Sequence, residues 1–133
     1  MNTNMKKAFS ILELIFIIAV LGIIAAIAVP KLMDTRNNAQ ATTIKQDIAT
    51  ITTSVQSYYM LNNSIEKISD TVSINPATWS ITDKKLEYEI QDKICVIIDV
   101  NNNKLTIDID ETSSEVCQKL YDEGIRDISY ELF

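Results

Sequence analysis

The stretch from Lys6 to Pro30, KKAFSILELIFIIAVLGIIAAIAVP, decides how the rest of the chain is organised. Two lysines precede an aromatic residue, Glu13 follows four positions later, and uninterrupted apolar residues then run from Leu14 to Val29. As a helix, residues 9–29 span about 31 Å, which matches the hydrocarbon core of a bilayer. The stretch is therefore either a membrane segment or an export signal.

Glu13 is the residue that bears most on function. A carboxylate within an apolar helix costs about 3 kcal/mol even on lenient insertion scales, and such residues usually mark function through a partner charge. If the chain is cut between Ala8 and Phe9, the new α-amine of Phe9 stands four residues before Glu13, on the same face of the helix. The two groups then pair within one chain, or between two staggered chains.

The short basic leader, the segment FSILEL and the apolar run ending in Pro30 resemble the N-terminus of type IV pilins and type II secretion pseudopilins. Members of that family carry a processing site before a phenylalanine, a glutamate at the fifth mature position and often a proline at the twenty-second. Phe9, Glu13 and Pro30 match all three positions. The residue before the cut is usually glycine in the family and is Ala8 here.

The resemblance implies cleavage by a prepilin peptidase on the cytoplasmic side of the inner membrane, and methylation of the new N-terminus at Phe9. It also implies self-assembly, and assembly with other pilin-like subunits, into a helical filament through the N-terminal helices, with Glu13 neutralising a neighbour's N-terminus. The expected location is a single pass of the inner membrane with a cytoplasmic leader and a periplasmic head, and later a periplasmic or surface filament. A short, acidic head favours a type II secretion or DNA-uptake apparatus over a major adhesive pilin.

An ordinary signal peptide is the alternative for the same stretch. Lys6 and Lys7 would form its basic region, and Ala26-Ile27-Ala28 would be the site for ordinary signal peptidase. Cleavage after Ala28 leaves a secreted, soluble binding module. Against this alternative, the apolar region is long for a signal peptide and Glu13 lies inside it without purpose.

Composition excludes several classes of function. The net charge is −6, and removal of residues 1–8, which hold two lysines and no acid, leaves −8. This balance argues against direct binding of nucleic acid, because phosphate attraction needs clustered Lys and Arg. The chain has no histidine, and its two glycines, Gly22 and Gly124, cannot build a phosphate-binding loop. We expect no enzyme activity and no cofactor.

The chain has two cysteines, Cys95 and Cys117, and both lie beyond the apolar stretch. An even count in an oxidising periplasm predicts one disulfide, worth roughly 3 kcal/mol for a loop of this length. The alternative is a pair of free, buried thiols.

Two further residues of the apolar stretch are candidates for assembly. Gly22 and Ala26 lie four apart, and small residues let helices approach closely in lipid, although such residues are also ordinary membrane composition. Pro30 cannot donate a backbone hydrogen bond and should kink or loosen the helix.

Residues 30–62 are expected to continue the helix of residues 9–29 as its amphipathic half. Apolar residues recur there at spacings of three and four, at Ile44, Ile48, Ile51, Val55 and Tyr59. The sequence Asn62-Asn63-Ser64 predicts the end of the helix.

Residues 63–133 are expected to form the head, with three to four antiparallel strands. Residues 86–90 and 105–109 alternate between apolar and polar, whereas residues 94–100 are nearly all apolar and predict a central strand covered on both faces. Asn101–Asn103 predicts a hairpin turn, and residues 125–133 an edge strand. Residues 63–85 show no regular pattern, and Trp79 within them is interpreted as a core residue. The fold class is therefore α+β, a long N-terminal helix packed by a small antiparallel sheet.

The last part of the chain carries two local signals. Thr112 and Glu115 have the spacing of a capping box that opens a short helix, and Gly124 ends it. Asp99–Asn103 imitates the start of a calcium loop but has Lys104 where glycine is required. A solvated turn is therefore favoured and no metal site is predicted. Some related pseudopilins bind calcium near the C-terminus, so a site at Asp108, Asp110 and Glu111 is the alternative.

Overall fold

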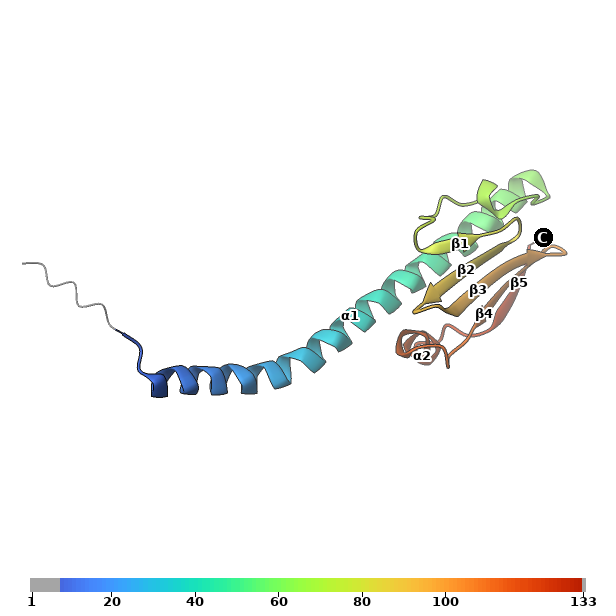
Figure 1. The fold of residues 1–133 in the computed structure, drawn as a ribbon. Helices are drawn as coiled ribbons and strands as arrows, with labels where there is room; N and C mark the ends of the chain where they lie inside the picture. The colour runs from blue at the N-terminus through green and yellow to red at the C-terminus, as the bar shows by residue number, and fades with distance from the viewer. Residues whose placement is uncertain (1–7, 133) are drawn as a thin grey trace, which may run out of the picture. The chain divides into compact units, whose positions relative to one another are not determined.

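The computed structural model describes residues 8–132; Phe133 and residues 1–7, with the leader lysines Lys6 and Lys7, lie outside the described part. The order of elements confirms the α+β class. The elements are α1 (Ile11–Asn62), a 3-10 turn η1 (Ile68–Asp70), β1 (Trp79–Ile81), β2 (Lys85–Ile90), β3 (Lys93–Asn101), β4 (Lys104–Ile109), α2 (Glu115–Asp122) and β5 (Ile128–Glu131) (Figure 1).

The chain divides into two compact units, Met1–Arg36 and Asn37–Phe133, and α1 contributes to both. In the first unit, every described residue from Ala8 to Arg36 is exposed. Within the part of the chain that the structure describes, α1 is the one helix long and apolar enough to cross a membrane. The apolar stretch is therefore helical and compatible with a single-pass membrane anchor.

In the second unit, α1 buries one face. The buried residues are those that the spacing of three and four predicted, joined by Ala41: Ile44, Ile48, Ile51, Val55 and Tyr59. α1 ends at Asn62, as the sequence Asn62-Asn63-Ser64 predicted. Asn63 adopts φ 56°, and its N–H donates to the carbonyl of Tyr59 at 2.7 Å, which satisfies one of the last carbonyls.

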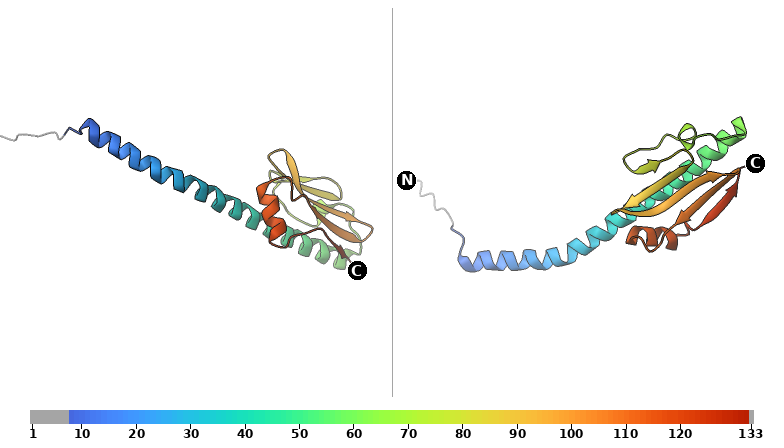
Figure 2. Two further views of the ribbon diagram at one scale, coloured as in Figure 1. Left: turned by 90° about the horizontal axis from the view of Figure 1, so that it is seen from below. Right: turned by 45° about the vertical axis from the view of Figure 1, so that its right-hand side comes forward.

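The sheet has five antiparallel strands in the order β1-β2-β3-β4-β5 (Figures 1 and 2). β2, β3 and β4 confirm the three patterned strands, and β5 confirms the edge strand near the C-terminus. The expected number of three to four strands is wrong, because β1 lies in the segment without a regular pattern. With three residues, β1 is too short to show alternation.

Two-residue turns connect the central hairpins. Asn102 and Asn103 have φ values of 49° and 62°, and Gln91 and Asp92 have 52° and 62°. Positive φ at both turn residues is the geometry that suits the twist of paired strands, and asparagine and aspartate tolerate it well. The predicted turn at Asn101–Asn103 is confirmed.

The apolar sequence of β3 predicted a strand covered on both faces, and this prediction is wrong. Ile94 is 38% exposed and Ile97 is half-buried, because α1 covers one face of this sheet only. The pairing of β2 with β3 shifts register at Tyr88/Glu89, so Cys95 has no partner in β2. This β-bulge leaves Cys95 and Val96 both buried, which lengthens the apolar run without a second covered face.

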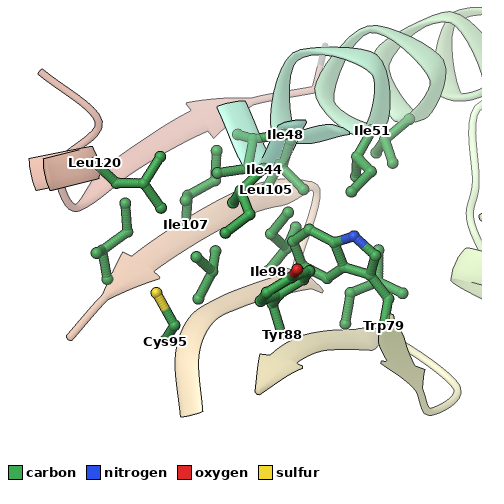
Figure 3. Packing of buried hydrophobic residues seen from close by; sticks show 14 of the residues in the cluster. Ile44, Ile48, Ile51, Trp79, Tyr88, Cys95, Ile98, Leu105, Ile107 and Leu120 are labelled. Atoms are coloured by element: carbon green, nitrogen blue, oxygen red, sulfur yellow. The ribbon is translucent and has the colours of Figure 1, made fainter. Parts of the chain in front are cut away.

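Trp79 is a core residue, as interpreted from the sequence, and only 1% of it is exposed. Its ring meets that of Tyr88 edge-on, with 5.1 Å between centroids and 70° between planes (Figure 3). Its indole Nε1 donates a hydrogen bond to Oδ2 of Asp47 on α1 at 3.1 Å. A buried tryptophan N–H needs such an acceptor, so this bond ties β1 to the helix.

The capping box predicted at Thr112 is wrong. The N-cap of α2 is Ser114, whose Oγ accepts a hydrogen bond from the N–H of Cys117 at 3.2 Å. Glu115 is the first helical residue, so it cannot fill the third position that a capping box requires. Gly124 follows the helix with φ 97°, as expected for the residue that ends it.

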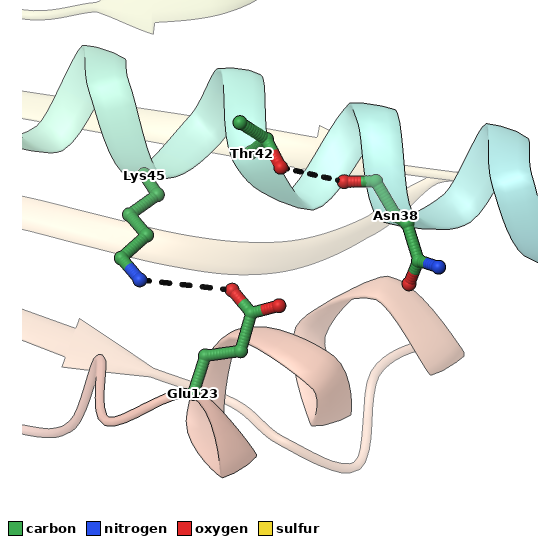
Figure 4. A network of polar contacts seen from close by, with 4 residues as sticks. All are labelled: Asn38, Thr42, Lys45 and Glu123. Atoms are coloured by element: carbon green, nitrogen blue, oxygen red, sulfur yellow. Dashed lines mark hydrogen bonds and ion pairs between the residues drawn. The ribbon is translucent and has the colours of Figure 1, made fainter.

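Polar contacts hold α2 beside α1 in the second unit. Lys45 Nζ lies 3.8 Å from Oε2 of Glu123 (Figure 4). Lys119 Nζ donates to Oδ1 of Asn38 at 2.9 Å. These contacts are exposed and individually weak, so the burial of Leu120 against the core contributes more to the docking of α2.

Candidate assembly site

The predicted processing site lies at the very start of α1. Ala8, Phe9 and Ser10 are exposed and not helical, and helical residues begin at Ile11. Ser10 serves as the N-cap: its Oγ accepts from the N–H of Glu13 at 3.2 Å, and its carbonyl accepts from Leu14 N at 3.1 Å. The Ala8–Phe9 peptide bond therefore stands in accessible, non-helical chain.

Glu13 lies in the first turn of α1 and is exposed. The partial positive charge at the start of a helix stabilises a carboxylate there. Ser10 and Glu13 also have the spacing of a capping box, a signal that the sequence analysis missed at this end of the chain. Among residues 8–132, no ion pair includes Glu13.

The surface around Glu13 is apolar and uncovered. Its exposed large side chains are Phe9, Ile11, Leu12, Leu14, Ile15, Phe16, Ile17 and Ile18, and the pattern continues to Met33. Soluble monomers rarely expose more than a few hundred Å² of continuous apolar surface. This apolar surface is compatible with a position in lipid.

Gly22 and Pro30, the other two predicted assembly residues, lie on the same exposed segment. A Cβ added at Gly22 would meet nothing within 4 Å, so no contact within the described chain requires a glycine there. Pro30 lies inside α1, which continues beyond it to Asn62.

The disulfide predicted between Cys95 and Cys117 is present in the second unit. It joins β3 to α2, with 5.8 Å between the Cα atoms and a sequence separation of 22 residues. Both cysteines are buried (Figure 3 labels Cys95). The bond is a structural clip that fixes α2 to the sheet.

Of the three residues of the alternative calcium site, Asp110 forms a hydrogen-bonded turn with Thr112. Thr112 donates its N–H and its hydroxyl to Oδ1 of Asp110, at 3.0 and 2.6 Å. Both hydrogen bonds lower the pKa of Asp110 below its ordinary value, and the bond from the hydroxyl has the larger effect. Asp108 is an exposed residue of β4. Across residues 8–132, no three His, Cys, Asp or Glu side chains are grouped closely enough to hold a metal ion.

Fold and site together define a class of protein: an α+β domain whose N-terminal helix is exposed as far as Arg36 and is long and apolar enough to span a membrane. No family model matches the chain, and no solved structure matches it. A 62-residue stretch is 31% identical to the type II secretion system core protein G of Pseudomonas aeruginosa. That stretch covers 47% of this chain and 44% of the Pseudomonas protein, so the match spans less than half of either. This partial similarity supports the resemblance to pilin-like proteins.

Proposed function

We propose that the protein is a pilin-like structural subunit that assembles into the filament of a type II secretion, DNA-uptake or type IV pilus system. One observation carries the proposal: the start of α1 is fully exposed and apolar, and Glu13 in its first turn has no ion-pair partner among residues 8–132. The partial similarity to a type II secretion core protein supports the same role. The role is mechanical rather than enzymatic.

The proposed organisation has four parts. Residues 1–8 are a leader that prepilin peptidase removes before Phe9, and Phe9 is then methylated. Residues 9–29 lie in the inner membrane, residues 30–62 are the amphipathic half of the same helix, and residues 63–133 form the periplasmic head. The exposed, non-helical position of the Ala8–Phe9 bond supports cleavage at this point.

In the proposed mechanism, Glu13 registers each new subunit against the last. The N-terminal ammonium of a processed chain pairs with the Glu13 carboxylate of its neighbour, and the pair is stable in lipid because each charge compensates the other. The apolar faces of neighbouring helices then pack, and Gly22 lets two backbones approach closely. Other pilin-like subunits with the same kind of helix join by the same contacts.

The decisive variant is Glu13→Gln, which keeps the size and polar character of the side chain and removes its charge. Removing one partner of a buried charge pair commonly costs about 3–5 kcal/mol, so filament recovery should fall by about 100-fold or more. The amount of processed subunit in the membrane should not change. Glu89→Gln, which alters an exposed glutamate of β2, is the matched control and should assemble normally. Filaments built equally well by Glu13→Gln would refute the proposal.

The N-terminus of the exported protein tests the proposal independently. Mass spectrometry should find a chain that begins at Phe9 and carries one added methyl group. A chain that begins at Val29 would instead establish a secreted module released by ordinary signal peptidase, with no assembly helix left.

A further inference from the structure

The second unit carries an apolar knob at the end of α1, formed by Met60 and Leu61. These side chains are 76% and 83% exposed, more than any other large apolar residue described between 37 and 132. The residues that follow, Asn62, Asn63 and Ser64, are polar but uncharged. The knob can therefore be buried without removing a formal charge from water.

The same unit has an unfilled apolar groove. It lies between residues 45–53 of α1 and residues 124–130, with a volume of about 390 Å³. Ile48, Ala49, Ile107, Ile125 and Ile128 form its apolar lining. Ile128 on the edge strand β5 is 44% exposed.

The cations beside the groove are already engaged. Lys45 forms its ion pair with Glu123, and the guanidinium of Arg126 lies 4.6 Å from the centre of the Tyr121 ring. An entering group therefore needs no negative charge to satisfy them, and an uncharged apolar group fits the groove better than a carboxylate.

We propose that the Met60–Leu61 knob of one copy of the chain docks into the groove of a second copy. Knob and groove are different surfaces of one unit, so the contact is heterologous: each copy offers a knob to one neighbour and a groove to another. A heterologous contact that does not close into a ring propagates as an open helical assembly. The inference rests on the proposed filament and adds a specific contact between periplasmic parts to the contacts of the N-terminal helices.

The position of the two surfaces along α1 sets the displacement between the copies. The α1 wall of the groove is centred near Ala49, and the knob lies eleven to twelve residues further on. At 1.5 Å per residue this is about 17 Å. In a filament of parallel subunits, the copy that offers the groove is therefore displaced by about this distance, in the direction in which α1 runs, from the copy that offers the knob.

Cysteine cross-linking in the assembled filament tests the contact. The full chain with Leu61→Cys and Ile128→Cys, oxidised in the membranes of cells that assemble it, should give a ladder of covalent multimers on a non-reducing gel. Each single variant should stay monomeric, because the native cysteines are buried in their own disulfide. The matched control combines Leu61→Cys with Ile94→Cys, which is 38% exposed and lies outside the groove, and should give no ladder.

Three results would overturn the contact: no ladder from the first pair, an equal ladder from the control pair, or a dimer from Leu61→Cys alone, which would show that knob meets knob. Leu61→Asp provides a second measurement and should lower filament recovery about tenfold or more, since it removes a buried leucine from the interface. Ile94→Asp should not.

The outcome is separable from that of the proposed function. If wild-type filaments depend on Glu13, but filaments of the Leu61→Cys, Ile128→Cys variant give no ladder, this contact is refuted and the filament proposal stands. A wild-type protein that forms no filaments refutes both.

Discussion

The disulfide between Cys95 and Cys117 gives the sharpest prediction about stability. The bond closes a loop between two cysteines that are 22 residues apart in the sequence, and reduction opens this loop. The chain-entropy relation assigns about 3 kcal/mol to a loop of this length. The second unit is about 100 residues long, and for that size 1 kcal/mol corresponds to about 4–8 °C in melting temperature. Reduction should therefore lower the melting temperature by about 12–24 °C.

The measurement uses the full chain in detergent micelles. Trp79 is the single tryptophan and is buried, so a shift of its fluorescence to longer wavelength reports unfolding of the core and ignores the helix in the micelle. Wild-type protein is melted with and without reductant, and the double variant Cys95→Ala, Cys117→Ala is melted in the same way. The variant should melt low in both conditions, since it has no disulfide to lose.

A small difference would refute the reasoning. If reduced wild-type protein melts within about 3 °C of the oxidised form, the disulfide does not restrain the unfolded chain as the entropy relation requires. If only the alanine variant melts at a low temperature, its loss of stability comes from the cavity that removal of the two sulfur atoms leaves in the core.

Three smaller predictions concern the segment before α2. Ser114→Ala removes the N-cap bond to Cys117 and should cost about 1 kcal/mol, measured by chemical denaturation. Thr112→Ala should cost less, because the backbone N–H of Thr112 still reaches Asp110; a larger loss at Thr112 would restore the capping box expected from the sequence. The pKa of Asp110 is lowered in the folded state, so its contribution to stability is present above about pH 4 and disappears as the pH falls through the folded value. Wild-type protein should therefore melt at a higher temperature than Asp110→Asn, and this difference should shrink below pH 4. A difference that grows below pH 4 would contradict a lowered pKa of Asp110 in the folded state.

Periodicity predicted the parts of the fold that are long enough to repeat. The stripe from Ile44 to Tyr59 covers more than four turns, and β2 and β4 each alternate over six residues, so burial of one face leaves a clear pattern. The turn at Asn102 and Asn103 was predictable because it needs residues that tolerate positive φ.

The errors at β1 and β3 depend on contacts between different elements of the fold, whereas the error at α2 depends on a local turn. β1 exists because Trp79 pairs with Tyr88 and reaches Asp47, neither of which is near it in sequence. The bulge at Cys95 hides the alternation of β3 by adding one apolar residue to the run. At α2, Thr112 and Ser114 both precede the helix as capable caps, and the choice between them depends on the turn that Asp110 makes with Thr112.

The position of Glu13 in the first turn of α1 lowers the free-energy cost of placing its carboxylate in lipid but does not remove that cost. At the first turn, the helix dipole stabilises a carboxylate by about 0.3–1 kcal/mol, which offsets only part of the roughly 3 kcal/mol that insertion costs. A positive partner is still needed. Before cleavage, the nitrogen of Phe9 is a neutral amide, whereas cleavage after Ala8 turns it into an ammonium group. In the proposed mechanism, processing therefore creates the very charge that Glu13 of a neighbouring chain requires, and a precursor that keeps its leader should enter the membrane but fail to assemble.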